Sequence, residues 1–586
     1  MLYTERAFAT PYSAFSLTIT RVACLAFGGV LTGALFERAP PDISRYFHAV
    51  QDTPVLLLFV VFFVAVNLIA KRNAPLPALG PVWRGSDFRF AGVIAIVVCF
   101  AVYAGSHLVY HHFALSLDEF MAEFDARIIA RAKLLASVAP EWRDYVPALQ
   151  PTFRLSVPEN AYWISSYLPM NAALRAVFVG LGDPAWEGAV LAGVAVVALF
   201  GVARRLWPER PDAAVVSVVL LVCSSQFLVM AMTPYAMTAH LAFNMLWLWL
   251  FLRDTRGSHL MAAGVAFVAC GLHQVVFHPL FAAPFMISLL TRRRWKLAAY
   301  YSTVYAAIGL FWVLYWSIVL AQANAPIGQS ADVGLLNFID RIVDMADLSA
   351  ANIGTMCVNL YRFVAWQCPI AIPLAVVGLL GCRTRNETVF NLAIGIAFTL
   401  AAVLVLMPFQ GHGWGYRYLH GFLGSVSLIA AHGWTRITNR DAEMTKAPAF
   451  ALAASAALSL LVLLPWRAIQ VHSFVEPYAA ASAAIERSNA DVVVVDPTNI
   501  WYGEDLVRND PFLQNLPKVL VLDFLDEALL RRLCQHHDVA IFDREDAPRF
   551  GLLNVESPSG QVGRNQRLRQ AMSSWGCGRP ALGGRS

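Results

Sequence analysis

Long apolar stretches separated by short polar turns make up most of this chain. Stretches close to the roughly 20 residues that a helix needs to cross a bilayer recur throughout residues 1–466. The first one, at about residues 12–35, has no convincing small-residue cleavage site and is interpreted as an anchor helix rather than a signal peptide. The pattern therefore predicts a polytopic α-helical membrane protein with about 13 transmembrane helices.

The basic residues give this predicted topology an orientation. Lys and Arg favour cytoplasmic turns, and placing all the basic turns in the cytoplasm works only if the segment 167–181 does not cross the membrane. That segment is short, contains Pro169 near its start and has Asn171 and Arg175 in its middle, so we expect it to lie flat on the outer face. The shortest predicted span is at about residues 279–291. The basic turns contain Lys71, Arg72, Arg84, Arg89, Arg204, Arg205, Arg210, Arg253, Arg256, Arg292, Arg293, Arg294, Lys296, Arg383, Arg385, Arg436, Arg440 and Lys446.

With this orientation, several polar segments share the outer compartment. They are a long loop at residues 111–184, a second loop at about 321–355, a short loop at 409–420, and everything after about residue 467. The predicted location is the bacterial cytoplasmic (inner) membrane, with the C-terminal part in the periplasm. In the first loop, the spacing of Phe120 and Phe124 with other apolar residues predicts an amphipathic interfacial helix over about 117–135, whose apolar face also includes Ile128 and Leu135.

The C-terminal part has a different pattern. Short β-branched runs "DVVVVD" (491–496), "KVLVLDF" (518–524) and "DVAIFD" (538–543) alternate with one helical segment, "DEALLRRLCQHH". Strand, helix and strand in alternation predict a small extramembrane α/β domain with a parallel sheet over residues 467–555. Residues 556–586 are rich in Gly, Ser, Pro and Arg without a period, so we expect a poorly ordered tail.

Composition agrees with a membrane protein and excludes other classes. Hydrophobic residues make up 58% of the 586 residues and charged residues only 14%, against roughly 25% charged in soluble domains. The formal net charge of +5 reflects the basic turns and does not predict nucleic-acid binding. The nine cysteines are odd in number and have no metal-ligand spacing, so neither a disulfide framework nor a zinc site is predicted. No carboxylate cluster implies another metal, and we expect no cofactor.

Asp118 and Glu119 form an acidic pair where the chain leaves the membrane. Acidic residues at a helix start commonly cap the helix and complement its dipole. A carboxylate fixed at the membrane rim can also act as a general base that takes a proton from an acceptor hydroxyl or amine. The two roles are compatible, and the residues alone leave both open.

The order of motifs around this pair resembles a known family. "LDEF…DARIIARAKLL" is followed by "SSYLPMNAALRAVFVGLG" and by a span that ends "VVALFGVARRLW". This order is similar to the polytopic glycosyltransferases of the GT-C fold, in the branch that contains protein O-mannosyltransferases and the aminoarabinose transferases of lipid A. The resemblance covers about residues 90–435. The chain has Tyr167-Leu168-Pro169 where that family often has Tyr-Pro-Pro, and two spans before the acidic loop where it usually has one.

The resemblance implies a transferase that moves a sugar from a polyprenyl-phosphate-linked donor to an acceptor at the outer face. The acceptor would be a glycan, a lipid or a protein, and membrane lipids would surround the enzyme. Asp118 matches the family's catalytic base, with Glu119 as its neighbour or substitute. Such an enzyme needs a base, a positive clamp for the leaving phosphate, and positioning.

The short loop "GHGWGYRYLH" supplies candidates for the positive clamp. Arg417 lies at the outer start of a span, between Tyr416 and Tyr418, and a guanidinium suits phosphate. An interfacial Arg in an aromatic belt is the ordinary alternative. His412 and His420 in the same loop are weaker candidates.

Other polar residues near the outer ends of spans are further candidates. Arg362 is an intramembrane charge, for which snorkelling is the common explanation. His273 and His278 could line a substrate cavity or bond between helices. Asp344 and Asp347 are weaker candidates for contact with an acceptor or a metal, and Asp496 is a weaker candidate for ligand binding at the end of a predicted strand.

Two other classes of function compete with the transferase. A transporter or flippase for a lipid-linked or polar substrate would favour inverted repeats and ionisable residues near the bilayer midplane. No internal repeat is visible, and the acidic pair lies in a loop. A membrane scaffold that presents the C-terminal domain would leave the two long outer loops without a purpose.

Overall fold

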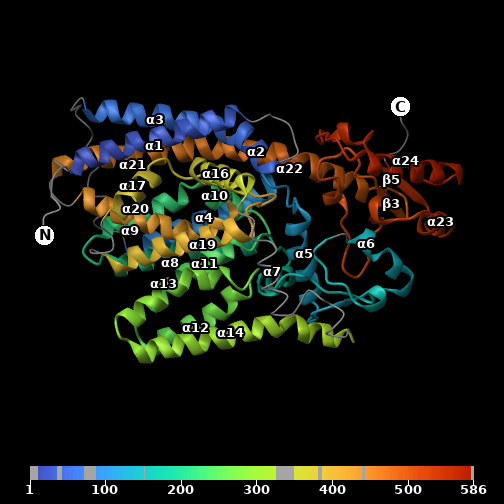
Figure 1. Cartoon of the computed structure of the whole chain (residues 1–586), viewed down its shortest axis with the longest axis horizontal. Helices are drawn as coiled ribbons and strands as arrows, with labels where there is room; N and C mark the ends of the chain where they lie inside the picture. Colours follow the sequence, from blue (N-terminus) through green and yellow to red (C-terminus); the bar gives the residue numbers. More distant parts are fainter. Residues whose placement is uncertain are drawn as a thin grey trace.

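The computed structural model describes residues 11–35, 42–71, 87–150, 152–324, 349–380, 386–438 and 442–581. In Figure 1, long helices form a bundle on the left and an α/β domain lies on the right. Within the described residues, seven helical segments are long and apolar enough to cross a membrane. This confirms the predicted fold class, a polytopic α-helical membrane protein. The seven segments are Ser16–Ala34, Ile43–Ile69, Phe88–Leu108, Trp186–Leu206, Trp295–Gln322, Glu387–Leu406 and Lys446–Glu486.

Shorter apolar helices pack among these long ones, and the predicted number of spans stays a prediction. The weakest predicted span corresponds to a 15-residue helix, α13. The bundle contains α1 (Pro11–Ala34), α2 (Ile43–Phe47), η1 (His48–Asp52), α3 (Thr53–Lys71), α4 (Phe88–Leu108), α8 (Trp186–Leu206), α9 (Pro211–Val222), α10 (Ser225–Met230), α11 (Met237–Phe251), α12 (Arg256–Cys270), α13 (Phe277–Thr291), α14 (Trp295–Gln322), α16 (Ala350–Ala365), α17 (Ala371–Leu379), α19 (Glu387–Leu406), η4 (Arg417–Phe422), α20 (Leu423–Ile437), α21 (Ala442–Leu458), η5 (Ser459–Leu463) and α22 (Leu464–Glu486).

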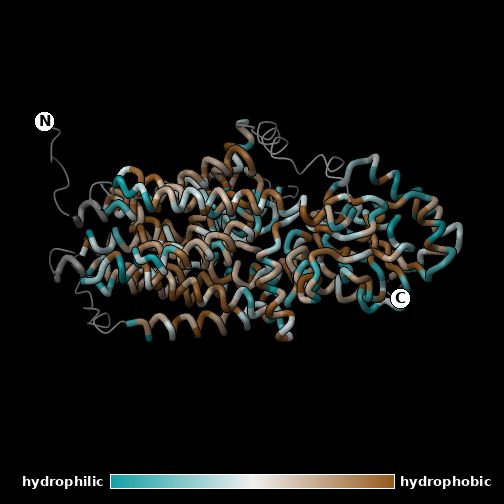
Figure 2. The backbone as a smooth tube through the Cα atoms, turned by 90° about the horizontal axis from the view of Figure 1, so that it is seen from below, coloured by the Kyte–Doolittle hydropathy of each residue, from teal (hydrophilic) through white to brown (hydrophobic). Residues whose placement is uncertain are grey.

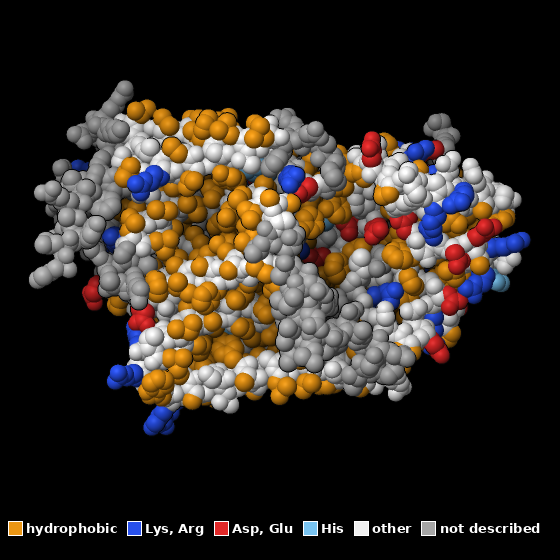
Figure 3. Space-filling model, in the orientation of Figure 1, with side chains coloured by type: hydrophobic (Ala, Val, Ile, Leu, Met, Phe, Trp, Pro, Cys, Tyr) orange, Lys and Arg blue, Asp and Glu red, His pale blue; other side chains and the backbone are white. Residues whose placement is uncertain are grey.

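Hydropathy divides the molecule in the same way as the fold. The helices of the bundle are mostly hydrophobic along their length, whereas hydrophilic segments gather in the α/β domain (Figure 2). On the face shown in Figure 3, the bundle presents broad apolar areas, with Lys and Arg at the end farthest from the α/β domain. Apolar surface on the outside of a bundle is typical of helices that face lipid.

The first long loop folds into a layer between the bundle and the α/β domain. Its main helices, α5 (Leu117–Ile129) and α7 (Met170–Leu181), pack against each other. Phe120 and Phe124 are buried as the pattern predicts, but α5 ends before the predicted helix does, and Leu135 lies beyond it. The loop also contains β1 (Ala136–Ser137), η2 (Pro140–Tyr145), α6 (Val146–Leu149), η3 (Pro158–Asn160) and β2 (Tyr162–Trp163).

Helix α7 is the segment that had to stay out of the membrane, and its central arginine is paired within the protein. The side chain of Arg175 is almost buried and lies 2.7 Å from Glu123 of α5 and 3.4 Å from Glu187 of α8. Pairing with two carboxylates compensates the cost of burying a guanidinium. The two ion pairs of Arg175 therefore hold α7 against α5 and α8.

The C-terminal part contains a four-stranded parallel sheet in the order β4-β3-β5-β6. Strands β3 (Val492–Val495), β4 (Lys518–Val521) and β5 (Val539–Phe542) coincide with the three predicted runs, and α23 (Glu527–His536) with the predicted helix. The four valines of β3 are completely buried because β3 is a central strand. The remaining elements are η6 (Gly503–Leu506), η7 (Leu522–Phe524), η8 (Ala547–Phe550), α24 (Ser559–Ser574) and β6 (Arg579–Pro580).

Two expectations for the C-terminal part were wrong. Residues 556–581, expected to be poorly ordered, contain α24 and β6, and α24 buries Asn565 and Met572 against the domain. Cys534 of α23 forms a disulfide with Cys577, although an odd number of cysteines gave no sign of pairing. The predicted boundary near residue 466 also lies within a helix, because α22 runs from the bundle into the domain.

Candidate active site

A cavity of about 490 Å³ lies where the bundle, the first long loop and the α/β domain meet. Asp118 and Arg417, which come from segments almost 300 residues apart, both line it. The predicted convergence of these two loops is therefore present in the fold. The lining residues are Ser116, Leu117, Asp118, Thr152, Phe153, Tyr235, Phe409, Gln410, Gly411, His412, Arg417, Pro497, Ile500, Tyr502, Gly503, Glu504, Asp505, Ser557 and Gln561.

Asp118 and Arg417 form an ion pair in the wall of the cavity. Nη1 of Arg417 donates to Oδ2 of Asp118 at 2.6 Å, and the two side chains are only 9% and 13% exposed. Asp118 is placed by the start of α5, where the hydroxyl of Ser116 accepts the backbone N–H of Glu119 as an N-cap. The attraction within a close, poorly solvated pair of this kind is stronger than in an exposed ion pair, and it offsets the cost of burying the two charges.

The guanidinium of Arg417 is held by aromatic rings and has donors to spare. It lies 4.8 Å from the ring centre of Tyr235 and 5.2 Å from that of Tyr418, both within cation–π range. Its Nη2 makes only a 3.5 Å contact with the hydroxyl of Tyr418, and its Nε has no hydrogen-bond partner among the described residues. Nε is also shielded from solvent, so the side chain would have to shift for a phosphate to bind both Nε and Nη2.

The surroundings of Asp118 keep it ionised. Burial alone would raise the pKa of Asp118, but the charge of Arg417, the nearby His273 and a hydrogen bond from the Tyr167 hydroxyl together hold that pKa below its usual value. His273 stacks on Tyr167, with ring centres 5.0 Å apart. Asp118 is thus a carboxylate at neutral pH and can accept a proton once a hydroxyl or amine is positioned beside it.

Glu119 does not line the cavity, which favours a structural role for it. Its Oε1 accepts from the hydroxyl of Tyr110 at 3.0 Å and its Oε2 accepts from the backbone N–H of Leu115 at 2.9 Å. Burial raises the pKa of Glu119 to about 8, so this side chain is largely neutral at pH 7. The carboxyl group fastens the turn before α5, and of the acidic pair only Asp118 reaches the cavity.

The substitution Glu119→Gln is expected to make stability less dependent on pH. The folded-state pKa of Glu119 is raised, so its stabilising contribution is complete below about pH 4.5 and is lost as the pH rises towards about 8. The glutamine does not titrate and can keep both hydrogen bonds, because the Tyr110 hydroxyl can also accept. As the pH rises between these values, the unfolding temperature should fall less for Glu119→Gln than for the wild type. Equal falls would contradict a neutral Glu119 carboxyl group.

The loop that carries Arg417 depends on glycines and on a buried ion cluster. Gly413 and Gly415 have positive φ angles of 148° and 68°, and a Cβ on Gly415 would lie 2.5 Å from the Gln226 amide oxygen. Arg362 donates to the carbonyl of Gly413 at 2.9 Å and pairs with Asp52 at 3.2 Å. Arg362 is completely buried and does not line the cavity, so it neither snorkels nor contacts a ligand there. It positions the loop.

The other predicted site residues fall into two groups. His412 lines the cavity, and Tyr418 and His273 lie directly behind Arg417 and Asp118. Tyr416 is buried, and its hydroxyl contacts the sulfur of Met356. His278 bonds between helices, with Asn244 at 2.8 Å and Tyr305 at 3.0 Å. The structure therefore gives Tyr416 and His278 packing roles.

One of the weaker candidates lies away from the cavity, and the other two lie outside the described residues. Asp496, at the carboxyl end of β3, is paired with Arg569 at 3.2 Å and accepts from Asn565 at 2.9 Å, both from α24. Helix α24 thereby covers the sheet edge at which a ligand was considered. Asp344 and Asp347 lie outside the described residues.

The α/β domain contributes residues that sequence reasoning missed. Asp505 accepts the backbone N–H of Leu117 at 2.8 Å, and its other oxygen lies 3.2 Å from Nε2 of His412. Glu504 lines the cavity beside it, and burial raises the pKa of Glu504 above its ordinary value. Nothing in the sequence around these residues marks them, because their partners are about 90 and 390 residues away.

Solved structures similar to this chain include two of one protein. No family model matches the chain, and no curated protein matches it. The crystal structure of ArnT from Cupriavidus metallidurans bound to undecaprenyl phosphate is 13% identical with a TM-score of 0.43, over 67% of this chain and 72% of that chain. The apo state of the same protein is 13% identical with a TM-score of 0.44, over 71% of this chain and 83% of that chain.

Proposed function

We propose that this protein is an integral membrane glycosyltransferase that moves a sugar from a polyprenyl-phosphate-linked donor to an acceptor on the periplasmic face. The observation that carries the proposal is the Asp118–Arg417 pair in the wall of a cavity at the end of the bundle. A carboxylate and a guanidinium at one site supply the base and the phosphate clamp that this reaction needs. The sequence resemblance to GT-C glycosyltransferases around Asp118 supports the same function.

In the proposed reaction, Asp118 is the general base. The acceptor oxygen or nitrogen attacks the anomeric carbon of the sugar, and its proton passes to the Asp118 carboxylate. The bond between that carbon and the phosphate oxygen breaks, and its electron pair leaves with the polyprenyl phosphate. Arg417 binds this phosphate through its guanidinium N–H groups and stabilises the charge that develops on it. Solvent then takes the proton from Asp118.

The contacts of the ion pair are consistent with this order of events. Nη1 of Arg417 contacts Asp118, while Nε has no partner among the described residues. Because Nε is also shielded from solvent, the Arg417 side chain must shift for a donor phosphate to reach it, and this shift draws the guanidinium away from Asp118. Once the donor phosphate shares the positive charge, Asp118 is less strongly held and becomes a better proton acceptor.

The placement of the site on the periplasmic side has two physical supports. Lys and Arg gather at the end of the bundle opposite the α/β domain (Figure 3), and such residues favour the cytoplasmic side. The α/β domain contains the disulfide Cys534–Cys577, which is typical of an oxidising compartment. Both observations support a location of the cavity on the side away from the cytoplasm.

Purified protein in lipid nanodiscs provides the test of this function. With a radiolabelled polyprenyl-phosphate sugar pool and a membrane extract as the acceptor source, we expect label to leave the lipid and free polyprenyl phosphate to accumulate. Unlabelled polyprenyl phosphate should inhibit this transfer and raise the thermal stability of the protein, because it binds the folded state. Unchanged stability and no transfer would contradict the proposal. Movement of intact labelled lipid between leaflets without loss of the sugar would identify a flippase instead.

A further inference from the structure

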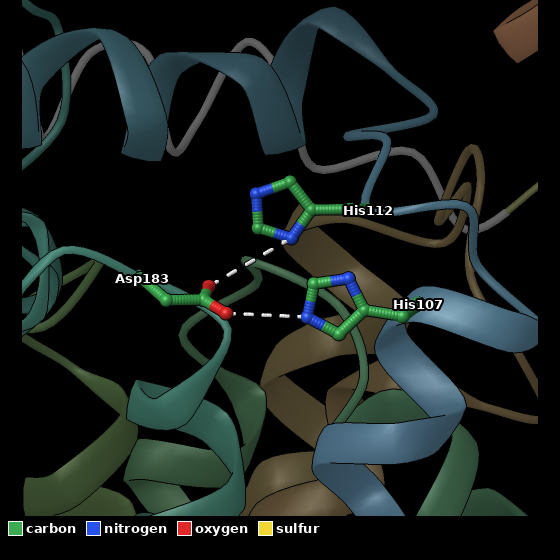
Figure 4. A group of neighbouring side chains, drawn as sticks. All are labelled: His107, His112 and Asp183. Atoms are coloured by element: carbon green, nitrogen blue, oxygen red, sulfur yellow. Dashed lines mark hydrogen bonds and ion pairs between the residues drawn. The ribbon is translucent and has the colours of Figure 1, made fainter.

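Two histidines and an aspartate meet at the rim of the bundle, outside the cavity. His107 is in the last turn of α4, His112 is in the turn that follows, and Asp183 precedes α8. Nε2 of His107 lies 3.2 Å from Oδ2 of Asp183, and Nδ1 of His112 lies 4.0 Å from Oδ1. Figure 4 shows a ring nitrogen of each histidine directed at the one carboxylate.

The arrangement has features of a prepared site. The two imidazole rings are parallel to within 4°, with centres 5.0 Å apart. His111 and His112 both have positive φ angles, of 55° and 50°, a left-handed conformation that persists in non-glycine residues only where the surroundings hold it. This conformation turns His112 back towards Asp183. The side chains are 40%, 40% and 25% exposed, so an ion can reach them from solvent.

The carboxylate is also oriented by groups that are not ligands. The hydroxyl of Tyr103 donates to Oδ2 of Asp183 at 2.8 Å, and the backbone N–H of Ala185 donates to Oδ1 at 2.9 Å. Fixed second-layer hydrogen bonds of this kind are typical of metal-binding carboxylates. In this structure they leave a lone pair on each carboxylate oxygen facing the histidines.

We propose that His107, His112 and Asp183 bind a divalent transition-metal ion of the Zn²⁺ class, with solvent completing its coordination. Two imidazole nitrogens and one carboxylate oxygen are a ligand set that zinc accepts. The ligand atoms lie within 4.8 Å of one another, whereas zinc–ligand bonds near 2.0 Å place tetrahedral ligands about 3.3 Å apart. Rotation of the exposed His107 and His112 side chains towards the fixed Asp183 carboxylate would close that difference.

A metal ion here would clamp the turn that supports the proposed active site. The turn between His107 and His112 contains Tyr110, whose hydroxyl donates to Glu119 at 3.0 Å and accepts from Nε1 of Trp414 at 3.2 Å. Trp414 belongs to the loop that carries Arg417. The metal ion would therefore have a structural role and take no part in the proposed reaction. Through Tyr110 it would steady both the start of α5, which carries Asp118, and the loop that carries Arg417.

The test uses the full chain in detergent without a polyhistidine tag. After stripping with a chelator and equilibration at micromolar free Zn²⁺, metal analysis should find about one zinc per wild-type chain. His107→Ala and Asp183→Asn should lower the affinity at least about tenfold, and Tyr103→Phe, which removes only a second-layer bond, by about tenfold. Zn²⁺ should also raise the unfolding temperature of the wild type but not of His107→Ala.

His536→Ala is the matched control, because His536 is exposed in the α/β domain and outside the cluster. It should bind zinc like the wild type. Equal zinc content in His107→Ala, Asp183→Asn and His536→Ala, or no zinc on the wild type, would overturn the site. The readout is metal binding, so this result is independent of whether the protein transfers sugar.

Discussion

Asp118→Asn is expected to abolish sugar transfer while the protein still folds and binds polyprenyl phosphate. The amide has the size of the carboxylate, and its oxygen can still accept from Nη1 of Arg417 and from the Tyr167 hydroxyl. It cannot take a proton from the acceptor, and loss of a general base typically costs about 10²–10⁴-fold in rate. Transfer from labelled donor in nanodiscs measures the rate, and the thermal shift with polyprenyl phosphate measures binding.

Asp125→Asn is a suitable control for this change. Asp125 is in the same helix, does not line the cavity, and burial raises its pKa to about 7. An asparagine closely resembles its protonated form, so Asp125→Asn should retain activity. Transfer by Asp118→Asn at a rate near that of Asp125→Asn would show that another group is the base.

Arg417→Lys is expected to lower transfer by about 10²–10³-fold and to weaken binding of polyprenyl phosphate. Lysine keeps the positive charge that Asp118 needs, but it lacks the planar fork that binds phosphate in a bidentate manner and stacks on Tyr235 and Tyr418. The magnitude is that of losing one donor to the developing charge of a leaving group. Initial rates and the polyprenyl phosphate concentration for half-maximal thermal shift are the measurements.

Loss of folding must be separated from loss of function at Arg417. Removing its charge alone leaves Asp118 buried without a counterion, which is strongly destabilising. The double change Asp118→Asn with Arg417→Met removes both charges and should unfold at a higher temperature than Arg417→Met alone. It should still neither bind polyprenyl phosphate nor transfer sugar. Normal lipid binding by this double variant would exclude Arg417 as the phosphate ligand.

The sequence predicted which loops meet but not which side chains face the cavity. Topology alone brings the loops of Asp118 and Arg417 to one side of the membrane. Consecutive residues at a helix start point about 100° apart, so Asp118 can face the cavity while Glu119 bonds to Tyr110 and Leu115. The hydrophobic pattern of the sequence does not show which of these two side chains points into the cavity.

Long-range polar partners account for most of the other differences. Arg362 was considered a phosphate ligand because an intramembrane charge is costly, but its partner Asp52 is 310 residues away in the chain. Helix α24 was missed because it is mostly polar and is held by contacts such as those of Asn565 and Arg569 with Asp496. Such pairs form only after the fold has brought distant segments together.

The continuous helical segment Lys446–Glu486 limits how the cavity can open. Its 41 residues make a rod about 60 Å long, roughly twice the thickness of the bilayer core. One end of this helical segment is fixed among apolar helices, and the other end carries the α/β domain. The wall of the cavity that the α/β domain forms therefore cannot move independently of this segment. Bending concentrates where the regular hydrogen-bond ladder is interrupted. In this rod those places are the π-helical turn η5 and the helix-internal prolines Pro448 and Pro477, so we expect any bending between the bundle and the α/β domain to concentrate there.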